Sequence, residues 1–397
     1  MVRVCRMGVW FAALAATATA RGEIELVAKG TIPGDLRDLS GLRETLTDGT
    51  PHDRIGGIGS GIAYTGKDDL YLMVADRGPK DGTVPFRCRF QTMRIVLKGK
   101  ALEATLKATT LLSDEKGNPF VGFQGALGKG ETGPRRLDPE GIRVGRTGTV
   151  FISDEYGPFI AEFSLEGKRI SSYPVPARFL LPSPQVEAEL ELEKNKTGRV
   201  PNRGMEGLAI VPDGSKLVAS MQSPLIQDGG RKGTNVRILE IDIATRKTRE
   251  FLYVLEGAHT GVSEILAVND HEFLVLERDG SSKSQKPPFR KIVKIDLAKA
   301  TDISGHETLP LNGVPKGVTP AAKSAFIDLM DPRFGLAGPD MPVKIEGLAF
   351  GPDLADGRHL LLVTSDNDFE PKAPIQLYGF GVGDKDLPGY AAQRFDK

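Results

Sequence analysis

Acidic residues recur at one position of a repeated motif, just before a stretch in which every second residue is apolar. In the most complete copy, Glu140 and Gly141 open such a stretch. Alternation with a period of two is the signature of a β-strand. The residues at the equivalent position of the other copies are Glu206, Glu264, Glu346 and, in place of an acid, Ser60. If the repeats surround one axis, we expect these side chains to converge on it.

A ring of carboxylates in a narrow space cannot stay ionised without compensation, so it must take up protons, basic side chains or a metal. Ca²⁺ prefers six to eight oxygen ligands. Only five histidines are present, and none lies in a repeated motif, which argues against zinc or a redox metal. Salt bridges to neighbouring Arg143, Arg203 or Lys344 and a protonated, hydrogen-bonded cluster are the alternatives. The metal ligands that the sequence predicts are Glu140, Glu206, Glu264, Glu346 and Asp366.

A second set of charges follows the next predicted strand in most copies. Because that strand runs antiparallel to the first, its end returns to the face where the acids lie. The charged ends are Asp76-Arg77, Asp154-Glu155, Glu277-Arg278-Asp279 and Asp366-Asn367-Asp368, whereas the third copy ends without an acid at Met221-Gln222-Ser223. Acids can activate water or bind cations, and arginines can bind an anion such as phosphate. The predicted catalytic residues are Asp76, Asp154, Glu155, Arg77 and Arg278.

The elements that position these residues are predicted strands in groups of four. Four antiparallel strands repeated around a centre are typical of an all-β fold, the β-propeller. Five copies are visible, and they lie further apart than the ~40–50 residues typical of short blades. Residues 181–203 and 311–343 could each hold a further blade, so six blades are predicted, with five or seven still open. Residues 23–32 are predicted to close the ring against the last blade. An open pair of β-sandwiches is the alternative.

The first twenty residues have the pattern of a signal peptide, with Arg3 and Arg6 before an apolar stretch and Ala18-Thr19-Ala20 at the cleavage position. An N-terminal anchor helix is the alternative. We expect export, to a bacterial periplasm or beyond, no membrane span after processing, and a monomeric single domain over residues 21–397. The chain has 52 basic and 52 acidic residues, so removal of Arg3 and Arg6 would give it a slightly negative net charge. This charge gives no reason to expect a nucleic-acid partner. Cleavage would remove Cys5 and leave Cys88 as the sole remaining cysteine, so no internal disulfide is expected.

Four segments together resemble the phytase-like family, a group of secreted bacterial proteins described by an esterase-like activity of phytase. They are residues 138–142, 154–157, 205–209 and 346–350, and the resemblance extends over about residues 55–380. It implies a calcium-associated propeller that hydrolyses ester or phosphoester bonds of a small anionic substrate. Ser60 and the acid-free third copy leave the acidic ring incomplete, which disfavours a two-metal phosphatase mechanism. A calcium lactonase and a non-catalytic propeller that binds a ligand or the cell envelope are the alternatives.

Overall fold

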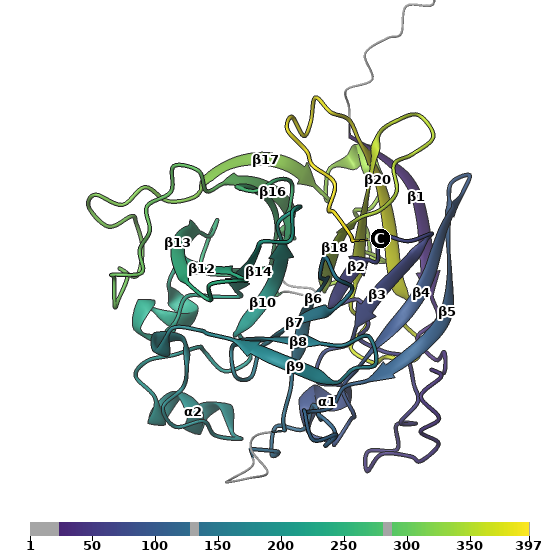
Figure 1. Ribbon diagram of the computed structural model, residues 1–397, viewed down its shortest axis with the longest axis horizontal. Coiled ribbons are helices and arrows are strands. Elements are labelled where there is room, and N and C mark those ends of the chain that lie inside the picture. The colour runs from purple at the N-terminus through teal and green to yellow at the C-terminus, as the bar shows by residue number, and fades with distance from the viewer. Residues whose placement is uncertain (1–23, 128–134, 281–287, 397) are drawn as a thin grey trace, which may run out of the picture.

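The computed structural model describes residues 24–127, 135–280 and 288–396, so the predicted signal peptide lies outside the described residues. These residues form twenty strands, which fall into five groups of four antiparallel strands around a common centre (Figure 1). In Figure 1 the first strand of each group lies near the centre, and β5, β9, β13 and β17 lie at the periphery. The fold is therefore the predicted β-propeller. No helix among the described residues is long and apolar enough to cross a membrane.

Each blade takes its strands in chain order from the centre outwards. Blade 1 contains β2 (Gly61–Tyr64), β3 (Leu70–Val74), β4 (Arg89–Lys98) and β5 (Ala101–Leu111). Blade 2 contains β6 (Pro139–Val144), β7 (Val150–Asp154), β8 (Phe159–Phe163) and β9 (Arg169–Tyr173). Blade 3 contains β10 (Met205–Ile210), β11 (Lys216–Met221), β12 (Asn235–Asp242) and β13 (Thr248–Val254). Blade 4 contains β14 (Thr260–Ala267), β15 (Glu272–Asp279), β16 (Arg290–Asp296) and β17 (Ala322–Asp328).

Blade 5 is completed by a strand from the other end of the chain. Its strands β18 (Ile345–Phe350), β19 (His359–Ser365) and β20 (Ile375–Val382) are joined by β1 (Glu25–Ile32). β1 runs antiparallel to β20, with Glu25 opposite Gly381 and Ile32 opposite Ile375. The closure predicted for residues 23–32 is thus confirmed over residues 25–32, and residue 23 lies outside the described residues. A parallel pair of Lys29 with Ala101 joins β1 to β5, so blades 5 and 1 touch at their outer edges.

The ring closes with five blades, not with the six that the sequence favours. The inner strands β2, β6, β10, β14 and β18 contact one another in that order, and β18 contacts β2. Neither insertion holds a sixth blade, because residues 181–203 contain a short helix and residues 311–343 supply β17, the outer strand of blade 4. The helical segments are α1 (Pro79–Gly82), η2 (Ala177–Phe179), α2 (Ala188–Lys194), η3 (Ile226–Asp228), η4 (Gly230–Lys232) and η5 (Pro332–Phe334).

The hydrophobic core lies in layers between neighbouring blades. Val74 and Ile152 share one fully buried cluster between blades 1 and 2, and Leu208 and Ile265 share another between blades 3 and 4. Burial of each such side chain contributes about 1.5–3 kcal/mol. Cys88 is buried in the first of these layers, and among the described residues the fold has no disulfide. The blades are therefore held together by apolar packing.

A β-bulge lies at the start of four of the five inner strands, and it determines which side chain faces the axis. In blade 3, Met205 pairs with Met221 and Gly207 pairs with Ser220, which leaves Glu206 in the bulge. The same irregularity falls at Glu346 in blade 5 and at Glu140 with Gly141 in blade 2. A bulge turns its extra residue out of the regular alternation of a strand. The three glutamates owe their common orientation to this device.

Blade 4 carries the bulge one residue earlier than the repeated motif indicates. The pairing with β15 skips Ser263, so Glu264 takes the paired position that Gly207 and Gly347 hold in other blades. The sequence-based equivalence of Glu264 with Glu140 is therefore wrong by one residue. The side chain at the true equivalent position of blade 4 is a serine hydroxyl, and in blade 1 the residue before β2 is Ser60.

The glycines that follow Glu140, Glu206 and Glu346 allow neighbouring inner strands to approach closely. A Cβ at Gly207 would lie 2.7 Å from the Ile265 nitrogen and 2.9 Å from the Glu264 Cα. Real Cβ atoms do not approach backbone atoms at such distances, so any other residue would push blades 3 and 4 apart. Gly207 thus sets the spacing of the inner strands at the level of the acids.

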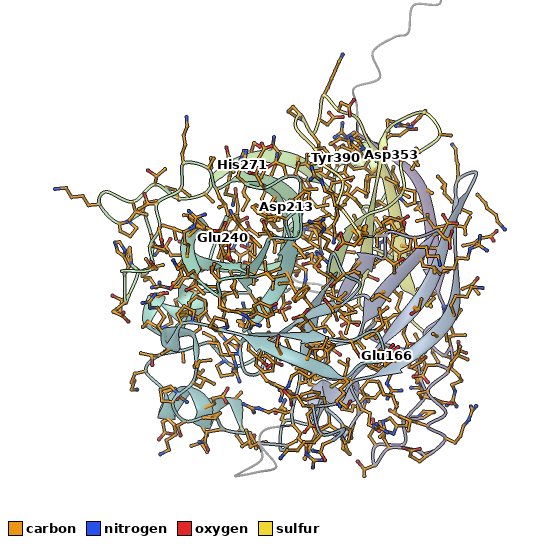
Figure 2. The ribbon with its side chains drawn as sticks, in the orientation of Figure 1. Glu166, Asp213, Glu240, His271, Asp353 and Tyr390 are labelled. Carbon is orange, nitrogen blue, oxygen red and sulfur yellow. The ribbon has the colours of Figure 1, made fainter. Side chains whose placement is uncertain are left out.

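The C-terminal segment, residues 390–396, closes the other end of the axis. Its backbone donates hydrogen bonds to carbonyl oxygens of Val268 (from Ala391, 2.9 Å) and Pro212 (from Arg394, 2.8 Å). The ring of Tyr390 packs against that of Phe350 in a tilted arrangement, with ring centroids 4.6 Å apart. A cavity of about 250 Å³ lies between this segment and the ends of the inner strands, and both Tyr390 and Asp353, labelled in Figure 2, line it. This cavity is at the opposite end of the strands from Glu140, Glu206 and Glu346.

Replacing Gly207 by alanine should lower the free energy of unfolding by about 1–3 kcal/mol, because the new methyl group meets fixed backbone of blade 4. The control is Gly305→Ala, where a Cβ would have no atom within 4 Å. Chemical denaturation of both variants measures the difference. Equal stability of the two variants would contradict the close approach of the inner strands.

Candidate functional site

Three of the four glutamates predicted to converge do so at one end of the propeller axis. Glu140, Glu206 and Glu346 come from the bulges of blades 2, 3 and 5 and are only 8%, 3% and 4% exposed. The loops after the second strands bring further buried acids beside them. These are Asp76 from blade 1, Glu155 from blade 2 and Asp366 from blade 5, joined by Asp138, which precedes β6. The structure therefore brings charged residues from several loops to the same face as the bulge glutamates. The acids among them fall into two groups.

The first group consists of Asp138, Glu140 and Glu155, all buried, whose carboxylate oxygens lie within 4.8 Å of one another. Arg77 compensates two of them, with Nη1 2.5 Å from Asp138 Oδ2 and 3.2 Å from Glu155 Oε2. Glu140 makes no hydrogen bond or ion pair with any described residue. Burial, followed by the charge of Glu206, raises the pKa of Glu140 well above its usual range. Glu140 is thus a buried acid that lacks a protein partner.

Glu206 adjoins this group and is also incompletely satisfied. Gln222 Nε2 donates to its Oε1 at 2.8 Å, whereas Oε2 is buried and has no partner among the described residues. Burial, with Glu155 and Glu346, raises the pKa of Glu206 well above its usual range. Two buried carboxylates with free oxygens beside Asp138 and Glu155 form an all-oxygen donor set. Such a set fits Ca²⁺, and protonation is the other way to satisfy it.

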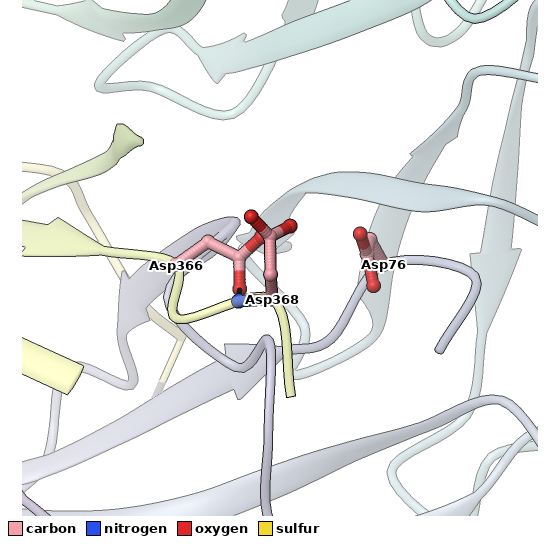
Figure 3. A group of neighbouring side chains, drawn as sticks. All are labelled: Asp76, Asp366 and Asp368. Atoms are coloured by element: carbon pink, nitrogen blue, oxygen red, sulfur yellow. Dashed lines mark hydrogen bonds between the residues drawn. The ribbon is translucent and has the colours of Figure 1, made fainter. Parts of the chain in front are cut away.

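The second group consists of Asp76, Asp366 and Asp368, which come from the loops after β3 and β19 (Figure 3). Lys344 already supplies a cation to it, with Nζ 2.9 Å from Asp366 Oδ2 and 4.0 Å from Asp76 Oδ2 and with an ion pair to Asp368. Burial, followed by the charge of Asp366, raises the pKa of Asp76 well above its usual range. Asp76, Asp368 and Lys344 line a cavity of about 460 Å³, together with Arg54. Asp76 therefore faces the larger open space at this end.

The two arginines predicted to bind an anion differ in their surroundings. Arg77 is 4% exposed and is surrounded by Asp138, Glu155 and Asp81, so it serves as a counter-ion for acids. Arg278 pairs with Glu346 through Nη2, 2.5 Å from Oε1, but its Nε is buried without a partner among the described residues. The Nε of Arg77 is also buried without a described partner, so the two arginines differ in the number of acids around them: three beside Arg77 and one ion pair at Arg278.

Asp154 lies outside both groups. Its carboxylate accepts the backbone N–H of Asp138 at 2.7 Å and that of Gly157 at 2.6 Å, and it is fully buried. Burial raises its pKa to about 7. These contacts fix the loop that carries Asp138 and Glu155, so Asp154 acts on the site through the residues that it positions.

Glu264 lies deeper along the axis, where it pairs with Arg143. Its Oε2 is 3.0 Å from Arg143 Nη2, and its Oε1 accepts the backbone N–H groups of Leu208 and Ile265. Burial raises the pKa of Glu264 to about 7. Arg143 also donates to the carbonyl oxygens of Ile62 and Ile265, both at 2.9 Å. At this level one salt bridge, and not a ring of them, neutralises the acid, and its contacts link blades 1, 2, 3 and 4.

Several residues of the site were not assigned a role from the sequence. Asp138 stands next to the motif acid and was visible in the motif, but a residue before a strand could equally be a turn residue. The sequence names Lys344 only as a possible salt-bridge partner of the motif acids, and does not indicate that it pairs with Asp366 and Asp368. Gln222 lies in the acid-free end of the third copy that the sequence shows, whereas only the pairing of the strands reveals that Ser263 is equivalent to the acids of other blades.

Comparison with known proteins places the chain in a family. Residues 53–369 match the family described as "Phytase-like: Esterase-like activity of phytase". A protein of Arthroderma benhamiae described as an uncharacterized secreted protein is 30% identical over 335 residues, which cover 65% of this chain. The match spans 63% of that relative's length.

Solved structures with similar architecture share little sequence with this chain. Regucalcin, a calcium-binding protein from Agrobacterium tumefaciens, is 9% identical with a TM-score of 0.39, covering 86% of this chain and 94% of its own. A structure from the GH130 family of mannoside phosphorylases is 10% identical with a TM-score of 0.45, covering 96% and 98% of the two chains. Both scores are below 0.5, so the propeller architecture rests on the strand pairing.

Replacing Arg143 by methionine should lower the free energy of unfolding by about 3–5 kcal/mol, because removal of one member of a buried pair leaves Glu264 uncompensated. The control is Arg146→Met, since Arg146 is half exposed and pairs with the exposed Asp396. A surface pair of this kind contributes about 0–1 kcal/mol. Denaturant titration of both variants provides the comparison, and equal losses would show that Arg143 is not a structural charge.

Proposed function

Because the chain belongs to the phytase-like family, we propose that it is an exported hydrolase of ester or phosphoester bonds that uses calcium at the acidic end of the propeller axis. Glu140 carries the proposal: it is a buried carboxylate among other acids, and no described side chain or backbone group compensates it. A protein does not retain such a group for stability, because an uncompensated buried charge is unfavourable. Export is supported by the description of the relative as secreted.

The proposed calcium ligands are Asp138, Glu140, Glu155 and Glu206. When bound, calcium supplies a Lewis acid that polarises an ester or phosphoryl oxygen and lowers the pKa of a bound water. Arg77 holds Asp138 and Glu155 in place, and Gln222 holds one oxygen of Glu206. These contacts leave Glu140 and the second oxygen of Glu206 free for a cation. Glu264 and Glu346 are engaged by Arg143 and Arg278, which favours a supporting role for both.

Asp76 is the proposed proton acceptor. It lines the larger cavity, and its Oδ1 accepts the backbone N–H of Gly78 at 3.0 Å, which fixes the orientation of the carboxylate. A raised pKa makes a carboxylate a stronger base toward water. Lys344 stands beside Asp76 and Asp366 and can stabilise negative charge on either carboxylate. An ester or phosphoester of a small anionic substrate fits this arrangement of acids and cations.

Addition of calcium to chelator-treated protein should raise the melting temperature, because a cation that binds only the folded state stabilises it. In Glu140→Gln this shift should fall to a small fraction of its value in the original protein. The control is Glu166→Gln, a fully exposed position labelled in Figure 2. Differential scanning calorimetry with calcium and with magnesium makes the measurement. A calcium shift that survives Glu140→Gln would remove Glu140 from the metal site.

Purified protein should hydrolyse members of a panel of phosphoesters and carboxylic esters, and a chelator should abolish the turnover. Asp76→Asn should reduce kcat by about 10²–10⁴-fold, the range for loss of a general base. Asp270→Asn, on an exposed aspartate, serves as the control. Chelator-insensitive turnover would refute the calcium mechanism, and faster opening of lactones than of either ester class would replace the proposed reaction.

A further inference from the structure

The ring of acids is interrupted between blades 3 and 4. At the bulge position, where blades 2, 3 and 5 have glutamates, blade 4 has Ser263. Just after the second strand, where blades 1, 2 and 5 supply the acids Asp76, Glu155 and Asp366, blade 3 has Gln222. Both replacements face the same place, because Ser263 and Gln222 line one small pocket. The repeat has therefore lost its negative charge at two positions that adjoin each other.

Basic side chains take the place of the missing acids. Arg203 and Arg278 line this pocket together with His259. The guanidinium of Arg203 makes no hydrogen bond or ion pair with any residue that the structure describes. Arg278 contributes the buried Nε that also lacks a described partner. Burial, followed by the charge of Arg231, lowers the pKa of Arg203, as expected for a cation near other cations.

The pocket presents hydrogen-bond donors to a small volume. Ser263 is 4% exposed, and its hydroxyl has no partner among the described residues. A guanidinium and a hydroxyl both donate, and a fixed fork of guanidinium N–H groups matches the geometry of carboxylate and phosphate. The pocket measures about 40 Å³. One water occupies about 10–15 Å³ by the same measure, so the space suits a group the size of a few waters.

We propose that this pocket is an oxyanion subsite, in which Arg203, Arg278 and Ser263 bind a phosphate or carboxylate group of the substrate. The location supports this, because Arg278 also pairs with Glu346 and Gln222 also donates to Glu206. An anion in the pocket therefore lies beside the acidic groups without sharing their space. Resting on the proposed hydrolase function, the subsite narrows the substrate to esters that carry an anionic group near the bond that is broken.

Arg203 could instead be a structural counter-charge for Glu155 and Glu206, both of which influence its pKa. The contacts do not favour this role. Glu155 is paired with Arg77 and accepts the backbone N–H of Gly204, and Glu206 accepts from Gln222. No ion pair joins Arg203 to either acid within the described part of the chain. A purely structural arginine would be expected to make such a pair.

Binding of sulfate and of acetate to the purified protein tests the subsite directly, by calorimetric titration in calcium-containing buffer and again with chelator. Sulfate represents a phosphoryl group and acetate a carboxylate, so the tighter probe identifies the chemical class. Arg203→Gln should weaken binding of the preferred probe at least tenfold, and Ser263→Ala should weaken it severalfold. Arg231→Gln is the control, since it removes a neighbouring exposed charge outside the pocket. Equal binding by Arg203→Gln and Arg231→Gln would overturn the proposal.

The kinetic counterpart separates this inference from the proposed function. Arg203→Gln should raise KM for an anionic ester at least tenfold while leaving kcat/KM for a neutral ester within twofold of the original. If both esters are affected equally, the subsite is refuted while the hydrolase function stands. If no ester is hydrolysed but sulfate or acetate binding depends on Arg203, the pocket is an anion site and the hydrolase function falls. The melting temperature of Arg203→Gln confirms that the variant is folded.

Discussion

Five inner strands converge on one axis, and the charges that they bring there share a space too narrow for separate hydration. The structure meets this constraint at two levels. Deep in the ring, Glu264 and Arg143 neutralise each other, and Arg143 binds carbonyl oxygens of neighbouring blades. Nearer the open end the compensation is incomplete: Glu206 Oε2 has no described partner, and the buried Glu140 carboxylate forms no ion pair with a described residue. The carboxylates that can still bind a cation or a proton therefore lie at the open end, where the charges on the axis are not fully neutralised.

Much of this arrangement follows from the repeat itself. Residues at equivalent positions of blades around an axis must meet, so the convergence of Glu140, Glu206 and Glu346 needed only the recognition of a repeated motif. The register of blade 4 could not be predicted in the same way. The sequence of Ser263 and Glu264 fits the repeated motif whether the bulge falls on the serine or on the glutamate. Only the pairing with β15 shows that it falls on the serine. A shift of one residue moved Glu264 from the acidic groups to the axial salt bridge.

Neither the number of blades nor the partners of the charged residues could be predicted from the sequence, and the reasons are related. The outer strand of blade 4 lies far along the chain from its neighbour β16, so the intervening loop looked like room for another blade. Arg77 and Arg278 appear at similar places in their copies, yet Arg77 pairs with three acids and Arg278 with Glu346. Those differences arise from residues of neighbouring blades, which local sequence does not identify.

The pairing of β1 with β20 has a consequence for when the protein can complete its folding. The strand that is synthesised first finds its partner only after residue 382 has been made, so the circle cannot be completed on a growing chain. Contacts between such distant parts of a chain are slow to form. Until then blade 5 lacks its outer strand, and the unpaired edge of β20 stays open. A chain with this topology cannot complete its ring until its last blade has been synthesised.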